Sequence, residues 1–565
     1  MLTLSVFLIQ FMFRNLDDNR LTRWSWTFSD VNIINIFAIL VLGVIIAYAF
    51  SKVSFPERYP GIFLFLSSFV ISVLFWEEPE VIVDTSRYFT QAKHLEVYGI
   101  KYFIEEWGRN IDVWTDLPLV PFLYGLIFKF FGEYRTYIQI FTTSLFSMTA
   151  VLIYLTGKTL WDKNTGFFAG LLFLGIPYIF SQVPTMLIDV PVMFFLMLSL
   201  FTFIKAMEKG GVWIAISSVA IFFAFFSKYS TWLMLSVLVV IFLVYLKVPS
   251  TPVSSTGQAL TLPFGWKGQG RGWTKRVIFS RGCSIALIAG FFIGIVILYK
   301  FDVISGQIRF LLEYQRPGLK RWSESFVSTF LFQVHPFITI SALFSAFIAF
   351  RKKDLRYLII VWLMFLLVAV FQIRRIRYLL IAFPMVTLMA SYALQEIKTM
   401  ELRRFIALCI VASSLVLAIF VYRPFLLKMS PVNLKNAGQY LNSLEIKNIE
   451  VFTLPQKRSV VNPAVTVPIL DLSTDKSIIY KYKKPPLMKW VQKSSLRFTW
   501  EYKNPEYYSI GGSKESGEAD AVVVIAGRAY PHLPDHIKKR LRGYRISRVF
   551  RTVTGVWRYR TIVTV

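Results

Sequence analysis

The chain alternates between long apolar runs and short polar connections from Val31 to Tyr422. A membrane-spanning helix needs about 17 to 25 apolar residues, and most of these runs have that length. The pattern predicts eleven spanning helices near residues 31–50, 60–76, 137–156, 187–205, 211–227, 229–247, 278–299, 326–350, 357–372, 378–395 and 404–423. Two more apolar segments, 117–131 and 165–182, contain prolines that weaken a continuous helix. We therefore expect about 11 to 13 transmembrane helices.

The pattern changes near Ser430, where the apolar runs end. The amphipathic stretch PVNLKNAGQYLNSL precedes IEVFTL, and DAVVVIAG precedes LPDHIKKRL and the β-rich end RVFRTVTGVWRYRTIVTV. Helical and strand periodicities alternate here, which is typical of a soluble α/β domain. We expect an N-terminal segment at 1–30, an all-α polytopic membrane domain at 31–425 and an α/β domain at 430–565, which serves as a structural or acceptor-docking cap. The apolar N-terminus lacks a basic n-region and a cleavage site, so we expect no cleaved signal peptide.

Composition excludes the soluble class and adds little to the choice of ligand. Hydrophobic residues make up 55% of the chain and the mean hydropathy is +0.55. The net charge of +29 lies mostly between apolar runs and in the C-terminal tail, which favours membrane lipids over nucleic acid as the partner. The only cysteines, Cys283 and Cys409, lie inside apolar runs, and His532 and His536 lack a third ligand. Neither pair predicts a metal site.

Basic loops predict the orientation of the helices. Short loops rich in Lys and Arg stay cytoplasmic, and three such loops fall on one side at 247–277, 351–356 and 396–404. The long 77–116 loop, the 300–325 loop and the C-terminal domain then lie on the other side. An even number of crossings must separate the 77–116 loop from Asp189, so only one of the two proline-containing segments crosses. Lys158 and Lys163 favour an interfacial position for the segment 117–131.

The 77–116 loop carries acidic, aromatic and basic residues in a long connection between apolar helices. Long ordered loops are usually functional. Its DTSRYFTQAKHLEVYG part predicts an amphipathic helix with Asp84 at the N-cap and Tyr88, Ala92 and Leu95 on one face. Capping alone would explain Asp84, and catalysis is the alternative.

Asp189, in TMLIDVPVMFF, is a carboxylate at the end of an apolar helix. Such a charge costs a few kcal/mol unless it faces water or a partner, so Asp189 is either a helix cap or part of a functional site. Lys228 and the RRIRY run at 374–378 place cations at the same predicted outer face, against the positive-inside bias. Cations kept on that side indicate an anionic ligand.

The order of these motifs resembles a known superfamily. Asp84-x-x-Arg-Tyr, LPLVPFLYGLIFKFFG, the Asp189-Val-Pro helix, AFFSKYS and RRIRYLLIAFP follow one another as in GT-C membrane glycosyltransferases. The likeness covers roughly residues 60–400 and is strongest to the branch of the lipid A aminoarabinose transferase and the dolichyl-phosphate-mannose protein mannosyltransferases. It implies a GT-C fold, a polyprenyl-phosphate-linked monosaccharide donor and inverting transfer to a lipid, glycan or protein acceptor.

The resemblance also implies roles for individual residues. Asp84 matches an essential acidic residue on the acceptor side, and we expect it to be the catalytic base. Residues expected to bind substrate are Arg87, Tyr88, Asp116, Asp189, Lys228, Arg316, Lys320, Arg321, Arg374, Arg375, Arg377 and Tyr378. Relatives often have a Lys-Pro-Pro or His-Pro-Pro where this chain has Asp116-Leu117-Pro118. A cation from Arg316, Lys320 or Arg321 is expected to replace the missing one.

Chemistry supports these residue types and leaves alternatives open. Lys228 and the Arg374, Arg375 and Arg377 cluster would stabilise the leaving lipid phosphate. The sequence identifies no cofactor, although paired carboxylates could bind Mg²⁺ or Mn²⁺. The main rival is a transporter or flippase of lipid-linked anionic substrates. A glycosidase needs no lipid-accessible scaffold, and an oligosaccharyltransferase would carry a WWDYG-type motif, which the C-terminal domain lacks.

Overall fold

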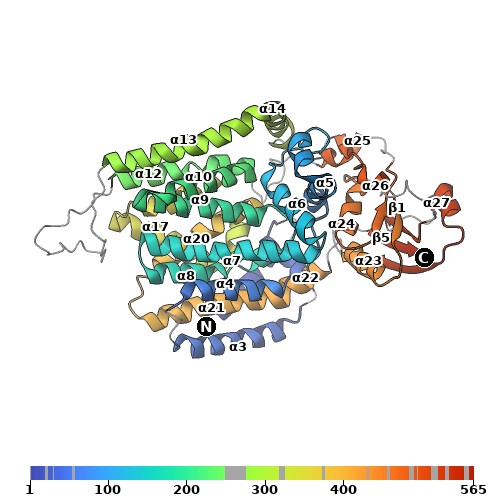
Figure 1. Cartoon of the computed structure of the whole chain (residues 1–565). Coiled ribbons are helices and arrows are strands. Elements are labelled where there is room, and N and C mark those ends of the chain that lie inside the picture. Colours follow the sequence, from blue (N-terminus) through green and yellow to red (C-terminus); the bar gives the residue numbers. More distant parts are fainter. Residues whose placement is uncertain are drawn as a thin grey trace, which may run out of the picture.

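The structure is a computed structural model of the whole chain. It describes residues 2–19, 23–29, 31–53, 58–247, 275–316, 325–371, 376–428, 432–454, 459–482, 489–492, 494, 496–510, 519–527, 533–552 and 559–564. The chain forms a helical bundle followed by a smaller domain that contains a sheet (Figure 1).

The bundle and the helices beside it account for residues 2–427. Their bounds are α1 (Leu2–Met12), α2 (Trp24–Thr27), α3 (Ile33–Ser51), α4 (Pro60–Val73), α5 (Ile82–Glu106), α6 (Leu119–Phe131), α7 (Arg135–Leu160), α8 (Lys163–Phe173), α9 (Asp189–Lys209), α10 (Val212–Ser227), α11 (Tyr229–Met234), α12 (Val237–Lys247), α13 (Lys275–Tyr299), α14 (Phe301–Phe310), α16 (Phe326–Ser328), α17 (Pro336–Lys352), α18 (Tyr357–Phe365), α19 (Ile376–Leu379), α20 (Phe383–Leu394), α21 (Met400–Leu417) and α22 (Arg423–Leu427).

Each of the eleven predicted spans coincides with helix. Among the described residues, seven helices are long and apolar enough to cross a membrane: Ile33–Ser51, Arg135–Leu160, Asp189–Lys209, Tyr229–Lys247, Lys275–Tyr299, Ile376–Leu394 and Met400–Leu427. The others are shorter. The span predicted at 326–350 begins too early, because a continuous helix starts only at Pro336, after an N-cap at His335. The chain is an integral, multi-pass membrane protein.

Burial orders the helices from the centre of the bundle to its rim. Helices α9 and α20 are buried along almost their whole length, whereas α3 and α13 expose large apolar side chains such as Ile34 and Leu287. Figure 1 shows α3 and α13 at opposite margins of the bundle. Exposed apolar faces on the outer helices are what a surrounding lipid phase requires.

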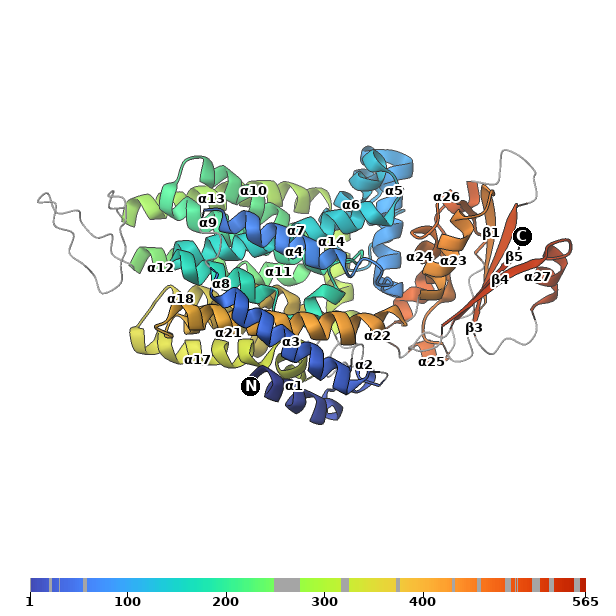
Figure 2. The ribbon, with the colours of Figure 1, turned by 90° about the horizontal axis from the view of Figure 1, so that it is seen from below.

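The two proline-containing segments take different positions. Helix α6 packs on α5 at the end of the bundle nearest the second domain (Figure 2), and α8 runs back along α7 and α20. A 3₁₀ turn, Pro177–Ser181, then leads towards Asp189. The chain therefore returns along the bundle through α8, whereas α6 lies with α5 at the end of the bundle.

The C-terminal domain is a mixed sheet covered on both faces. Strands β1 (Asn448–Thr453), β2 (Ser477–Ile479), β3 (Ala521–Gly527), β4 (Ile546–Arg551) and β5 (Tyr559–Thr564) lie in the order β2-β1-β3-β5-β4. Strand β1 is parallel to β2 and β3, and β5 is antiparallel to β3 and β4. The helices of this domain are α23 (Val432–Asn442), α24 (Val467–Asp471), α25 (Lys489–Gln492), α26 (Tyr507–Ile510) and α27 (Asp535–Arg540).

Alternation along β3 explains the covering of the sheet. Val523 and Ile525 pack in the cluster that contains α23 and α24, whereas Val522 and Val524 pack with Ile537 of α27. A strand buried on both faces reads as a continuous apolar run, which accounts for AVVVIAG. The predicted α/β character of this domain is confirmed.

A buried ion-pair cluster joins the two domains. Lys93 of α5 lies with its Nζ 2.6 Å from Asp471 Oδ2 of α24 and 3.0 Å from Glu133 Oε2. Tyr508 donates a hydrogen bond to the same Asp471 carboxylate at 2.7 Å. Burial lowers the pKa of Lys93, but the two carboxylates outweigh it and the net pKa is raised. Because Lys93 is on α5, the C-terminal domain is tied to the helix that also carries Asp84.

Candidate active site

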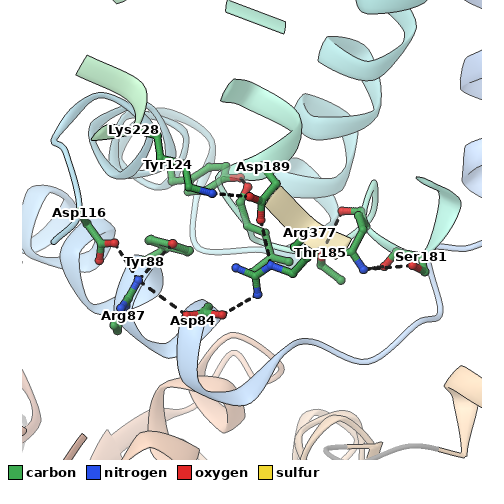
Figure 3. Close-up of polar contacts among 12 residues, drawn as sticks. Asp84, Arg87, Tyr88, Asp116, Tyr124, Ser181, Thr185, Asp189, Lys228 and Arg377 are labelled. Atoms are coloured by element: carbon green, nitrogen blue, oxygen red, sulfur yellow. Dashed lines mark hydrogen bonds and ion pairs between the residues drawn. The ribbon is translucent and has the colours of Figure 1, made fainter. Parts of the chain in front are cut away.

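Six charged side chains form one ion-pair chain, in which positive and negative groups alternate, at the end of the bundle next to α5 (Figure 3). In order they are Lys228, Asp189, Arg377, Asp84, Arg87 and Asp116. Lys228 Nζ lies 2.7 Å from Asp189 Oδ1, and Arg377 Nε lies 3.1 Å from Asp189 Oδ2. The other side of the Arg377 guanidinium reaches Asp84 Oδ2 at 2.5 Å. The three carboxylates and three cations give the ion-pair chain no net formal charge.

The ends of several helices bring these residues together. Asp189 is the first residue of α9, Lys228 lies between α10 and α11, and Arg377 is in α19. Asp84 and Arg87 lie in the first two turns of α5, and Asp116 precedes α6. The side chains of Asp189 and Arg377 are almost fully buried, at 1% and 7% exposure. Buried charges are stable only when paired, which accounts for the alternation.

Glu80 fixes the beginning of α5, although the sequence argument did not single it out. Its carboxylate accepts hydrogen bonds from the Thr85 hydroxyl at 3.1 Å, from Arg135 Nε at 2.7 Å and from the Met186 amide at 2.8 Å. These bonds tie α5 to α7 and to the segment before α9. Asp84 is thereby held opposite Asp189.

The helix-cap explanations of Asp84 and Asp189 are wrong. The N-caps are Val81 for α5 and Ile188 for α9, and both aspartates lie inside their helices. Their carboxylates make ion pairs with Arg377 instead. The predicted buried face of α5 is confirmed, because Tyr88 and Ala92 are almost fully buried.

Arg87 and Asp116 form one end of the ion-pair chain. Arg87 Nη2 lies 2.7 Å from Asp116 Oδ1 and 3.7 Å from Asp84 Oδ1. Burial raises the pKa of Asp116 to about 6, although Arg87 opposes the shift. The acidic residue at position 116 is thus next to a cation, which Arg87 supplies. Gln91, four residues after Arg87, donates to the same carboxylate at 3.2 Å.

Aromatic rings lie against the cations at both ends of the ion-pair chain. Lys228 Nζ lies 4.4 Å from the centre of the Tyr378 ring. The Arg87 guanidinium lies 5.3 Å from the Tyr88 ring, 5.6 Å from Trp114 and 5.4 Å from Phe498 of the C-terminal domain. Cation–π contacts of this kind favour a partly desolvated cation. Trp114 has a φ of +42°, a conformation that costs a bulky residue about 1–3 kcal/mol.

Two further side chains connect this end to α11 and α14. Gln307 Nε2 donates to the Asp116 carbonyl oxygen at 2.9 Å, and Tyr229 donates to Gln307 Oε1 at 2.7 Å. Gln307, Tyr229, Glu80 and Phe498 were not predicted. Of these four, only Tyr229 could have been found from the sequence, because it follows Lys228 in the SKYS motif.

Arg377 occupies the position that the metal alternative assigns to a cation. Its guanidinium lies between Asp84 and Asp189 and pairs with both carboxylates. In the part of the chain that the structure describes, no three His, Cys, Asp or Glu side chains are grouped to hold a metal ion.

Of the remaining predicted residues, the structure describes only Arg316. Arg316 is exposed at the end of the turn after α14 and makes none of the described contacts with it. Lys320, Arg321, Arg374 and Arg375 lie outside the described residues, as does His532.

Comparisons with known proteins follow the same order of motifs. Residues 116–262 match the dolichyl-phosphate-mannose-protein mannosyltransferase family, which is about a quarter of the chain. The fold is similar to that of ArnT from Cupriavidus metallidurans bound to undecaprenyl phosphate, with a TM-score of 0.52, 12% identity, and coverage of 90% of this chain and 98% of that one. The chain has the GT-C fold.

Two other solved structures match the chain. The apo structure of the same ArnT gives a TM-score of 0.53 at 12% identity, covering 89% of this chain and 97% of that one. The oligosaccharyltransferase of Archaeoglobus fulgidus in its apo form covers 70% of this chain and 63% of that one at 12% identity, with a TM-score of 0.43. No curated protein sequence matches the chain. The family match, within this fold, indicates a glycosyltransferase of the GT-C type.

Proposed function

We propose that this GT-C chain transfers a monosaccharide from a polyprenyl-phosphate carrier to an acceptor hydroxyl by inverting displacement. The observation that carries the proposal is the position of Arg377, which pairs with both Asp84 and Asp189 while Lys228 pairs with Asp189. Two cations and a carboxylate that can act as a base thus meet at one end of the bundle. The structural match to an ArnT bound to undecaprenyl phosphate supports the choice of carrier.

Lys228 and Arg377 are suited to the carrier phosphate. As the bond between C1 of the sugar and the phosphate oxygen breaks, negative charge grows on the phosphate. Preorganised cations then stabilise the transition state more than the bound donor. Asp189 holds both cations in place in the free enzyme, and its burial keeps water from screening them.

Asp84 is the proposed base. It accepts the proton of the acceptor hydroxyl while the acceptor oxygen forms its bond to C1, and the polyprenyl phosphate departs with the electron pair of the broken bond. In the free enzyme Asp84 is neutralised by Arg377. A phosphate that binds Arg377 competes with this ion pair, so donor binding would release Asp84 for proton transfer.

The distribution of charge supports an extracytoplasmic site. Arg351 and Lys352 lie in the last turn of α17, and Arg356 follows this helix. Lys352 pairs with Glu396, and Arg356 donates to the Leu160 carbonyl at the end of α7. Asp189 begins α9, and Lys209 ends it at the opposite end. The basic loops therefore gather at one end of the bundle and the proposed site at the other, as the positive-inside rule requires of an outward-facing site.

The same placement favours an enzyme over a flippase. A translocation path would hold its charged residues near the middle of the bundle between broken helices. Here the ion-pair chain lies at the helix ends beside α5. An enzyme cleaves its donor, whereas a flippase moves it intact.

Binding of polyprenyl phosphate, the expected product, tests the carrier site. We expect native mass spectrometry of the purified protein in nanodiscs to show a complex that weakens at least 10-fold in Lys228→Met and in Arg377→Met. Arg423→Met is the control, because Arg423 pairs with exposed Glu77, which is not a member of the ion-pair chain. Equal affinity in all three variants would contradict the proposed phosphate site.

A further inference from the structure

A 3₁₀ turn of the C-terminal domain, Arg497–Glu501, reaches the proposed site. Its Phe498 ring lies 5.7 Å from the Trp114 ring at an angle of 64°, and both rings contact the Arg87 guanidinium. Arg87 stands between Asp84 and Asp116. The C-terminal domain therefore contributes a side chain beside the proposed base, although Phe498 follows Asp84 by more than 400 positions.

Contacts on both sides of Phe498 hold the turn in place. Tyr314 donates a hydrogen bond to the Ser494 carbonyl oxygen at 2.9 Å, and Lys503 Nζ lies 3.3 Å from Asp112 Oδ1. Asp112 is two residues before Trp114, so one ion pair links the turn directly to the loop that carries the second ring. The relative positions of the two rings are thereby fixed.

Both rings are only half-buried, and Phe498 also packs against the core of the C-terminal domain. Trp114 also keeps a left-handed backbone conformation that its bulk disfavours. A smaller or glycine residue would relieve that strain. A large half-buried ring maintained in this way, next to charged side chains, is typical of a ligand contact.

We propose that the aromatic pair Trp114 and Phe498 binds a sugar ring of the acceptor; this rests on the proposed glycosyl transfer and names its acceptor class as a carbohydrate. A pyranose has an apolar C–H face that buries area against an aromatic ring. Its hydroxyls project from the edge of the ring, so a stacked sugar directs them sideways towards Arg87 and Asp84. A peptide offers its Ser or Thr hydroxyl from an extended chain and has no such flat face.

Saturation-transfer NMR on the full-length protein in nanodiscs tests the aromatic pair with defined probes. The probes are mannotetraose, maltotetraose and a Gly-Ser-Thr-Gly peptide. We expect at least one oligosaccharide to give a signal that falls at least fivefold in Phe498→Leu, which keeps apolar volume without an aromatic face. Phe498→Tyr should retain the signal, and so should Phe550→Leu, which removes a half-buried ring on β4 at the edge of the sheet.

Two results would overturn the aromatic pair as a sugar site. One is that no oligosaccharide gives a signal dependent on Phe498, and the other is that only the peptide does. Polyprenyl-phosphate binding, measured on the same samples, should change less than twofold in Phe498→Leu. If the wild-type protein binds polyprenyl phosphate but no oligosaccharide, the aromatic pair is rejected as a sugar site and the proposed function stands. If it binds an oligosaccharide but no polyprenyl phosphate, the proposed function is rejected and the aromatic pair stands.

Discussion

The guanidinium of Arg377 lies 2.5 Å from the carboxylate of Asp84, although 293 positions separate the two residues. The same guanidinium lies 3.1 Å from Asp189. A planar, forked cation can contact two carboxylates at once, which a single ammonium group does not do as well. Arg377 therefore couples the proposed base to the proposed phosphate site.

Replacing Arg377 by Lys should slow transfer without removing the charge. The ammonium can satisfy Asp84 or Asp189 but not both in the same geometry, and one donor to the leaving phosphate is lost. Loss of one such donor typically costs about 10²–10³ in kcat. Steady-state rates of Arg377→Lys, with Arg423→Lys as the matched control at an exposed pair, check this. A near-wild-type kcat for Arg377→Lys would mean that the bridging geometry is not used.

Asp116 should give the pH profile an inflection near 6. Burial raises the pKa of Asp116 to about 6, so the carboxylate is protonated as the pH falls from 7 to 5 and Arg87 loses its closest partner. We expect the transfer rate to fall over this range. In Asp116→Asn the inflection near 6 should be absent. An unchanged acid limb in that variant would assign the inflection to another group.

The same shift has a defined sign for stability. The folded-state pKa of Asp116 lies above its ordinary value of 3.8, so between about pH 4 and 6 the folded protein holds a proton that the unfolded chain has lost. The contribution of Asp116 to stability should therefore decrease as the pH rises through this window and stay constant above it. Thermal unfolding from pH 4 to 8 should show this difference between wild type and Asp116→Asn, and the opposite slope would refute it.

The helices were predictable from sequence because lipid imposes a length and an apolar composition on each span. Asp84, Asp189 and Lys228 could be found because each interrupts an apolar or amphipathic pattern. The pairing between them could not, since it depends on how distant helix ends meet. Phe498 shows the limit most clearly: one aromatic residue in a soluble domain carries no signal until the fold places it beside Arg87.

Local sequence also misled where two explanations share a pattern. An Asp at a helix start is typical of an N-cap, yet Asp84 and Asp189 lie just inside their helices and pair with Arg377. The helix expected at 326–350 ran through Pro336 because its composition is apolar on both sides. The proline at the first helical position instead marks the true start.

Removing Lys93 should loosen the C-terminal domain. Lys93→Met leaves Asp471 and Glu133 without their countercharge in a buried environment, and breaking such a pair typically costs about 3–5 kcal/mol. Lys538→Met, at an exposed pair with Asp535, should cost less than about 1 kcal/mol. Thermal unfolding together with limited proteolysis between α22 and α23 measures both. Equal stability of the two variants would show that the buried cluster does not hold the domains together.

Cysteine labelling should place the two ends of the bundle on opposite sides of the membrane. After replacement of Cys283 and Cys409, a cysteine at exposed Lys398 should react only from the cytoplasm, and one at exposed Glu506 only from outside. The reason is the gathering of basic loops at the Lys398 end. Labelling of both positions from the same side would overturn the predicted topology.

Release of polyprenyl phosphate tests the central claim most directly. Purified protein in nanodiscs is given polyprenyl-phosphate monosaccharides and candidate acceptors, and the freed carrier is measured in wild type, Asp84→Asn and the control Asp302→Asn on α14. We predict acceptor-dependent release by wild type and the control, and a loss of at least about 10²-fold in Asp84→Asn, because the acceptor proton has no base. Undiminished release in Asp84→Asn would contradict the account.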